Sequence, residues 1–265
     1  MLRTMDSRPV GVFDSGVGGL SVLRHFQQLA PNEHTVYFAD TAFFPYGPRP
    51  AAEVRKRSFA IAHRLLRSDV KLIIVACNTA SAAAIADLRE AFPVPFVGMV
   101  PGLKPAAQSS RSGNVAILAT PGTLDGDLYA RVVDEFGRAA KVTNVPGHGL
   151  ADLVEAGGAN SPQARDAVRR ALGPAVEAGA DTVVLGCTHY HFLADDITAE
   201  FPAVTLVDTS EPVARRAVQV LREQGLDAPP DNQARLDIIV SGDPASFRQR
   251  MTELGFAPGI EEALA

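Results

Sequence analysis

Nine short apolar runs alternate with longer segments of helical periodicity along this 265-residue chain. Between most of the runs, apolar residues recur at helical spacing, as they do in 80–92 and 211–224. This alternation is typical of βαβ units and mostly parallel sheets, whose strands are buried on both faces and therefore hydrophobic throughout. We expect an α/β protein. The predicted strands are Pro9–Asp14, Thr35–Asp40, Lys71–Ala76, Val94–Met99, Asn114–Thr120, Lys141–Val145, Asp181–Gly186, Val204–Asp208 and Leu236–Ser241.

Two pairs of motifs indicate an internal duplication. "IIVACNTA" around Cys77 aligns with "VVLGCTHY" around Cys187. "GVFDSGVGG" around Asp14 aligns with "AILATPGTL" around Thr120 at nearly the same offset. We therefore expect two similar α/β domains, each with a mostly parallel sheet, and an active site in the cleft between them. Pro, Gly and Ser cluster in 98–114, where the two halves would join.

Charge and hydropathy exclude several classes of protein. The net charge of -5 argues against a nucleic-acid partner, because such proteins usually carry a basic excess. No apolar run reaches membrane-spanning length, and the N-terminal residues lack the apolar core of a signal peptide, so we expect no membrane partner and a cytoplasmic location. One basic cluster reads as the solvated face of an amphipathic helix. It comprises Arg49, Arg55, Lys56, Arg57, Arg64 and Arg67.

The chain has two cysteines, which in the cytoplasm are expected to be free thiols. His189 and His191 stand near Cys187, but no C-x-x-C pair accompanies them, so we expect no metal site.

Polar residues follow four of the predicted strands directly. In open parallel α/β sheets, ligands bind at the carboxyl ends of the strands, so these positions are the candidate site. They are Asp14 and Ser15, then Cys77, Asn78 and Thr79, then Thr120, and finally Cys187, Thr188 and His189.

The first of these junctions is rich in glycine. Gly16, Gly18 and Gly19 open a helix after a strand, and such a turn exposes N–H groups that can hold a small carboxylate. Ser21 stands where a dinucleotide-binding fingerprint needs its last glycine, so that function is not supported. The alternative is a tight turn in which Asp14 or Ser15 caps the helix.

The cysteine junctions point to proton transfer. A thiol at a helix N-terminus has a lowered pKa, and we expect this for Cys77, which precedes a predicted helix. Inert packing in the core and nucleophilic catalysis remain alternatives. Two thiols facing one carbon would instead invert its configuration, one removing a proton and the other delivering one to the opposite face. Without pyridoxal phosphate, the neighbouring Ser, Thr and Asn donors would stabilise the carbanion.

Five motifs, in this order, resemble cofactor-independent glutamate racemases of the aspartate/glutamate racemase superfamily. They are "GVFDSGVGGLSV", "YFADTAFFPYG", "ACNTASA", "AILATPGT" and "LGCTHY", and the match runs from Val10 to about Asp208. The resemblance implies an isomerase that needs no cofactor and converts L-glutamate to D-glutamate for peptidoglycan, and hence for cell-wall biogenesis and cell shape.

The resemblance also implies roles for individual residues. Cys77 and Cys187 would be the acid/base pair, with Asp14, Glu155 and His189 as the polar neighbours that tune them. Substrate contacts would come from Asp14, Ser15, Tyr46, Gly47, Asn78, Thr79, Thr120, Thr188 and His189. The implied domains are 1–100 with 209–265, and 101–208, and the implied assembly is a homodimer.

Two alternatives remain at this point. A racemase of another small acid, such as aspartate or a hydantoin, would share the motifs, although His189 favours glutamate by resemblance. A binding protein for a small acid would share the two-lobed architecture. His191 stands where a proline is common in the similar proteins, and the sequence assigns it no role.

Overall fold

The structure, a computed structural model, describes residues 5–256. All nine predicted strands are present, with ends that coincide with the predicted ones or differ from them by one or two residues. They are β1 (Val10–Asp14), β2 (Thr35–Ala39), β3 (Leu72–Val75), β4 (Phe96–Gly98), β5 (Asn114–Ala119), β6 (Lys141–Pro146), β7 (Thr182–Gly186), β8 (Thr205–Val207) and β9 (Leu236–Val240).

The strands form two sheets, and every strand pairing in both is parallel. The first has five strands in the order β4-β3-β1-β2-β9, and the second has four in the order β6-β5-β7-β8. Read from β8, the second sheet repeats the order of the first four strands, with β5 in the place of β1 and β7 in the place of β3. The predicted fold class is therefore confirmed, and both cysteines follow equivalent strands.

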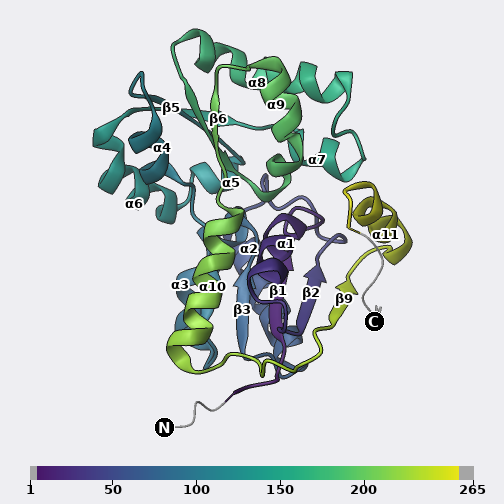
Figure 1. Ribbon diagram of the computed structural model, residues 1–265. Helices are drawn as coiled ribbons and strands as arrows, with labels where there is room; N and C mark the ends of the chain where they lie inside the picture. The colour runs from purple at the N-terminus through teal and green to yellow at the C-terminus, as the bar shows by residue number, and fades with distance from the viewer. Residues whose placement is uncertain (1–4, 257–265) are drawn as a thin grey trace.

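Helices cover both faces of each sheet, and Figure 1 shows the two resulting bodies one above the other. No helix within residues 5–256 is long and apolar enough to cross a membrane. The helices are α1 (Leu20–Leu29), α2 (Ala51–Leu66), α3 (Asn78–Ala91), α4 (Leu103–Ser109), α5 (Pro121–Leu124), α6 (Asp127–Phe136), η1 (Gly137–Ala139), α7 (Leu150–Glu155), α8 (Pro162–Glu177), η2 (Thr188–Leu193), α9 (Ala194–Glu200), α10 (Ser210–Gln224) and α11 (Pro244–Glu253).

The alternation of side chains along each strand explains why helices cover both faces of a sheet. Successive side chains of a strand point to opposite faces, and in β1 Val12 joins the core shared with α1 and α10, whereas Phe13 joins the core beneath α2 and α3. Both residues are fully buried. The aliphatic core thereby holds the carboxyl end of β1, where Asp14 lies, in a fixed position.

The C-terminal part of the chain returns to the first sheet. Strand β9 pairs with β2, starting at Thr35 opposite Leu236, and α10 packs against α1. The exact limits of the two domains stay a prediction.

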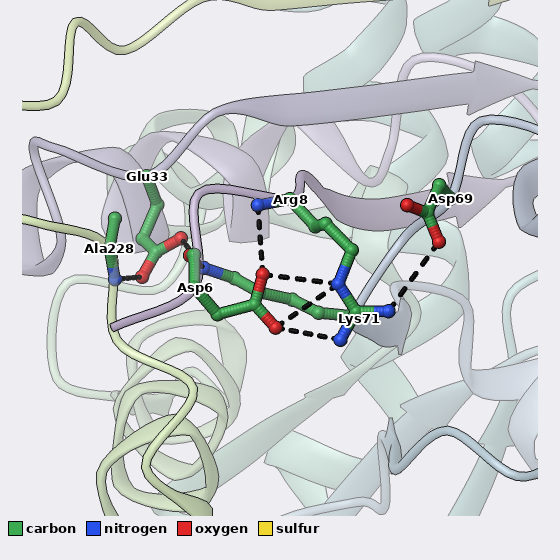
Figure 2. A network of polar contacts seen from close by, with 6 residues as sticks. All are labelled: Asp6, Arg8, Glu33, Asp69, Lys71 and Ala228. Atoms are coloured by element: carbon green, nitrogen blue, oxygen red, sulfur yellow. Dashed lines mark hydrogen bonds and ion pairs between the residues drawn. The ribbon is translucent and has the colours of Figure 1, made fainter. Parts of the chain in front are cut away.

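A buried ion pair lies at the amino end of the first sheet, away from the strand ends that carry the candidate site (Figure 2). Lys71 Nζ is 2.6 Å from Glu33 Oε2, and the two side chains are 0% and 5% exposed. Lys71 also donates to the carbonyl of Asp6 at 2.5 Å, and Glu33 accepts from the N–H of Ala228 at 2.8 Å. Burial raises the pKa of Glu33, although Lys71 opposes that shift. The pair joins segments distant in sequence.

Replacing Lys71 with methionine should lower the free energy of unfolding by about 3–5 kcal/mol, because Glu33 would keep a buried charge without its partner. The double variant Lys71→Met/Glu33→Leu removes both charges and should lose much less. Urea denaturation at pH 7 measures both values. A loss below about 1 kcal/mol for the single variant would show that Glu33 does not depend on Lys71 for its burial.

Candidate active site

The strand ends of the two sheets meet around one pocket of about 130 Å³. Most of the residues expected from the sequence line it: Ser15, Tyr46, Gly47, Cys77, Thr79, Thr120, Cys187, Thr188 and His189. Asp14, Asn78 and Glu155 do not line it, but each is adjacent in sequence or hydrogen-bonded to a residue that does. The structure thus gathers the two thiols and their polar neighbours in one place.

The sequence prediction missed part of the lining. Three of the missed residues, His148, Asp152 and Tyr190, have ionisable side chains. His148 lies two residues after the end of β6. Searching "KVTNVPGHG" for polar residues at the carboxyl end of its strand would have found it. The missed lining residues are Phe44, Pro45, Pro48, Pro121, Gly147, His148, Gly149, Ala151, Asp152 and Tyr190.

The glycine-rich turn after β1 holds carboxylates of the protein itself. Asp14 Oδ2 accepts from the N–H of Gly19 at 2.8 Å, and Glu155 Oε1 accepts from the N–H of Val17 at 2.7 Å. A Cβ atom at Gly16 would lie 1.7 Å from Glu155 Oε1, and one at Gly18 would lie 2.5 Å from Thr188 Oγ1. Glycine at these positions therefore allows the turn of the first body to touch α7 and η2 of the second.

Cys77 ends the segment between β3 and α3, and its Sγ accepts from the N–H of Ala80 at 3.5 Å. Burial, followed by the negative charge of Asp14, raises the pKa of the Cys77 thiol well above its usual value. The expectation of a lowered pKa for Cys77 is therefore wrong, because the N–H of Ala80 at the helix N-terminus opposes the rise but does not outweigh it. The helix offers one long hydrogen bond, whereas the side chain is 5% exposed and its neighbour is a carboxyl group.

Asp14 at the end of β1 is fully buried, and its Oδ1 has no hydrogen-bond partner among the described residues. Burial raises the pKa of this carboxyl, and the positive charge of His189 opposes the shift. Asp14 thus interacts electrostatically with both the Cys77 thiol and the His189 imidazole.

Cys187, His189 and Glu155 form a chain of contacts on the other side of the pocket. His189 Nδ1 lies 3.9 Å from Cys187 Sγ, and His189 Nε2 lies 2.7 Å from Glu155 Oε1. Burial alone would lower the pKa of His189, which is 2% exposed, but Cys187, Glu155 and Asp14 together raise it well above its usual value. The raised pKa favours the imidazolium form of His189, whose positive charge would stabilise negative charge on a neighbouring sulfur.

Hydroxyl groups from both bodies meet at the wall of the pocket. Thr79 and Thr120, which follow strands of the first and second sheets, have their Oγ1 atoms 2.8 Å apart, and Thr123 joins them at 2.9 Å from Thr120. Asn78 is 2% exposed, and neither atom of its amide has a hydrogen-bond partner in the part of the chain described. Buried polar groups are normally paired, and Asn78 directly follows Cys77, so its unpaired amide is a candidate ligand contact although it does not line the pocket.

The hydroxyl of Tyr46 already has a hydrogen-bond partner in the protein. Its hydroxyl donates to Asp40 Oδ2 at 2.6 Å, and Arg57 Nε donates to the same carboxylate at 2.7 Å. Any contact of Tyr46 with a ligand would thus come from its ring or main chain. Arg57 belongs to the basic cluster that the sequence assigned to a solvated face, and for Arg57 that assignment is wrong because the side chain reaches inward to a buried carboxylate.

His191 also has a structural partner. Its Nδ1 lies 3.0 Å from Asp208 Oδ1, which also accepts from the N–H of Ser210 at 2.5 Å. The pair joins η2 to the segment where the chain crosses back to the first sheet. Within residues 5–256, no group of three His, Cys, Asp or Glu side chains is placed to hold a metal ion.

Comparisons with known proteins agree with this geometry. A family model described as Asp/Glu/Hydantoin racemase matches residues 10–217. A glutamate racemase of Deinococcus radiodurans is 46% identical over 93% of this chain and 86% of its own length.

Solved structures are similar to this one over nearly the whole chain. The glutamate racemase of Thermus thermophilus, in complex with β-chloro-D-alanine, superimposes with a TM-score of 0.82 at 38% identity, covering 98% of each chain. That of Escherichia coli, in complex with L-glutamate and the activator UDP-MurNAc-ala, gives a TM-score of 0.84 at 32% identity over 97% of each chain.

Proposed function

This chain belongs to the Asp/Glu/hydantoin racemase family, and we propose that it interconverts L-glutamate and D-glutamate by proton transfer at the α-carbon between Cys77 and Cys187. One observation carries the proposal. The two thiols follow equivalent strands of two sheets with the same strand order, and both line one pocket. Inversion at a carbon needs a proton acceptor on one face and a proton donor on the other, and two opposed thiols provide both.

The charges around the thiols support different starting states for them. Cys77, whose pKa is raised by burial and by Asp14, is the protonated thiol. Cys187 lies 3.9 Å from His189 Nδ1, and we assign it the role of taking the α-proton because the raised pKa of His189 favours positive charge beside this sulfur. After the transfer both cysteines have exchanged states, and the reverse reaction uses them in opposite roles.

Polar groups that line the pocket, or lie next to a residue that does, would bind the substrate. The hydroxyls of Thr79, Thr120 and Thr188 and the amide of Asn78 are suited to donating hydrogen bonds to a carboxylate. These bonds become stronger as negative charge develops on the substrate. The α-proton can be removed in this way without a cofactor.

The product suits the role that the family has in peptidoglycan synthesis, which requires D-glutamate. The homodimer and the cytoplasmic location expected from the sequence stay predictions.

Parallel assays with L-glutamate and L-aspartate test the substrate. With no cofactor added, chiral chromatography should detect D-glutamate, and kcat/KM for glutamate should exceed that for aspartate by about 10–200-fold, the usual effect of one missing methylene. Faster turnover of aspartate would favour a racemase of another small acid. Tight binding of glutamate without turnover would favour a binding protein.

A further inference from the structure

The C-terminal helix α11 is anchored to the first body and lies beside α7 of the second (Figure 1). Phe247 stacks on Tyr37 of β2 with ring centroids 6.1 Å apart, and the hydroxyl of Tyr37 donates to the carbonyl of Gly16 at 2.8 Å. From α1, Arg24 donates to the carbonyl of Leu254 at 2.8 Å. Helix α11 is thus fixed against β2 and α1, which belong to the body that holds Cys77.

One side chain of α11 reaches the other body. Arg250 Nε donates to the carbonyl of Glu155 at 2.9 Å, and the Arg250 side chain is 16% exposed. Glu155 is the last residue of α7, and the last carbonyls of a helix have no partner within it. A cation is favourable at this end of a helix because the carbonyls carry partial negative charge.

The turn after α7 leaves room for this contact. Gly157 has a φ of +79°, and a Cβ atom there would lie 1.7 Å from Arg250 Nη1. The guanidinium therefore lies directly against the main chain that follows Glu155, where only glycine fits.

We propose that Arg250 is a positioning residue, which holds the end of α7 so that the Glu155 carboxylate stays against His189. The carboxylate of Glu155 contacts His189 and the N–H of Val17, and the carbonyl of the same residue contacts Arg250. Without Arg250, the main chain at Glu155 loses this hydrogen bond to α11, and the carboxylate is less well fixed. The effect on catalysis, but not that on His189 itself, rests on the proposed function.

Loss of the Arg250 hydrogen bond would act on His189 through the charged and ionisable groups around its ring. Glu155 faces the ring from α7, Asp14 from the end of β1, and Cys187 from the end of β7. Phe44 packs on the ring with centroids 5.5 Å apart and brings no charge. Because Glu155 is the group that Arg250 holds, a less well-fixed Glu155 should lower the pKa of His189 and leave the other contacts in place.

The test compares Arg250→Met, Arg250→Lys and the control Glu253→Gln. Glu253 pairs with Nη1 of Arg250, whereas Nε makes the bond to Glu155, so the control removes the ion pair of a half-exposed carboxylate and keeps the donor of that bond. NMR titration of the histidine rings, with the His189 signal assigned from a His189→Asn variant, should give a lower pKa for His189 in Arg250→Met only. Arg250→Lys keeps a cation at the end of α7, so the pKa of His189 in this variant should be close to the wild-type value.

The kinetic readout is a fall in kcat of about tenfold for Arg250→Met with little change in KM, because a catalytic group is displaced without loss of a substrate contact. The alkaline limb of the kcat profile should also move to lower pH, since the imidazolium is lost earlier. An unchanged His189 titration in Arg250→Met would overturn the proposal, whatever the effect on stability. If wild-type protein does not racemise glutamate but the titration shifts as expected, only the proposed function fails.

Discussion

Replacing either Cys77 or Cys187 with alanine should lower kcat for glutamate racemisation by about a thousandfold or more. Each thiol is the only proton-transfer group that we assign to its face of the substrate, and a positioned acid or base contributes about 10²–10⁴-fold. Losing either one stops inversion, because the remaining thiol can only return a proton to the face from which it came. The two single variants and the double variant should therefore be similarly inactive.

The fold should tolerate these substitutions. Both cysteines are buried and both are free thiols, so alanine removes one sulfur atom from the edge of the pocket. We expect a loss of about 1 kcal/mol in the free energy of unfolding, and glutamate binding, measured by calorimetry, should persist. A single variant that kept more than about a tenth of wild-type kcat would remove that cysteine from the mechanism.

The second large effect is expected for His189 and Glu155. Either His189→Asn or Glu155→Gln should reduce kcat by about a hundredfold, because the positive charge next to Cys187 is removed or weakened. The double variant should lose little more than the worse single variant, since the two residues act as a unit. His34 provides a matched control: it pairs with Asp237 at 3.0 Å, at the opposite end of β2 from the pocket. His34→Asn should leave kcat unchanged.

The pH dependence of these variants follows from the raised pKa of His189. The pairing of His189 with Glu155 is complete at low pH and is lost as pH rises through the folded-state pKa of His189, which lies above the unfolded value. Wild-type kcat should therefore fall at alkaline pH, and in Glu155→Gln this fall should begin at lower pH. A Glu155→Gln profile that coincides with the wild-type profile after scaling would contradict the role assigned to His189.

Strand positions and the location of the pocket could be predicted from the sequence, and contacts between elements could not. Apolar runs identify strands because parallel strands are buried on both faces, and the strand-end rule then located Cys77, Thr120 and Cys187. The pKa of Cys77 depends on burial and on Asp14, two structural facts that its sequence neighbours do not reveal.

The same limit applies to the contacts that join the two bodies. Gly16 and Gly18 read as a possible anion-binding turn, yet they accommodate Glu155 and the η2 turn, residues more than a hundred positions away. No sequence pattern pointed to Arg250, because it donates to a main-chain carbonyl that any residue would provide.

The most direct test of the two-thiol mechanism is racemisation of L-glutamate in heavy water, analysed by mass spectrometry during the first few per cent of conversion. Proton removal by one thiol and delivery by the other predicts D-glutamate with deuterium at the α-carbon from the earliest samples, while the remaining L-glutamate stays unlabelled. D-glutamate that keeps the original proton would instead indicate that one group serves both faces, and would contradict the assignment of Cys77 and Cys187 to opposite faces of the substrate.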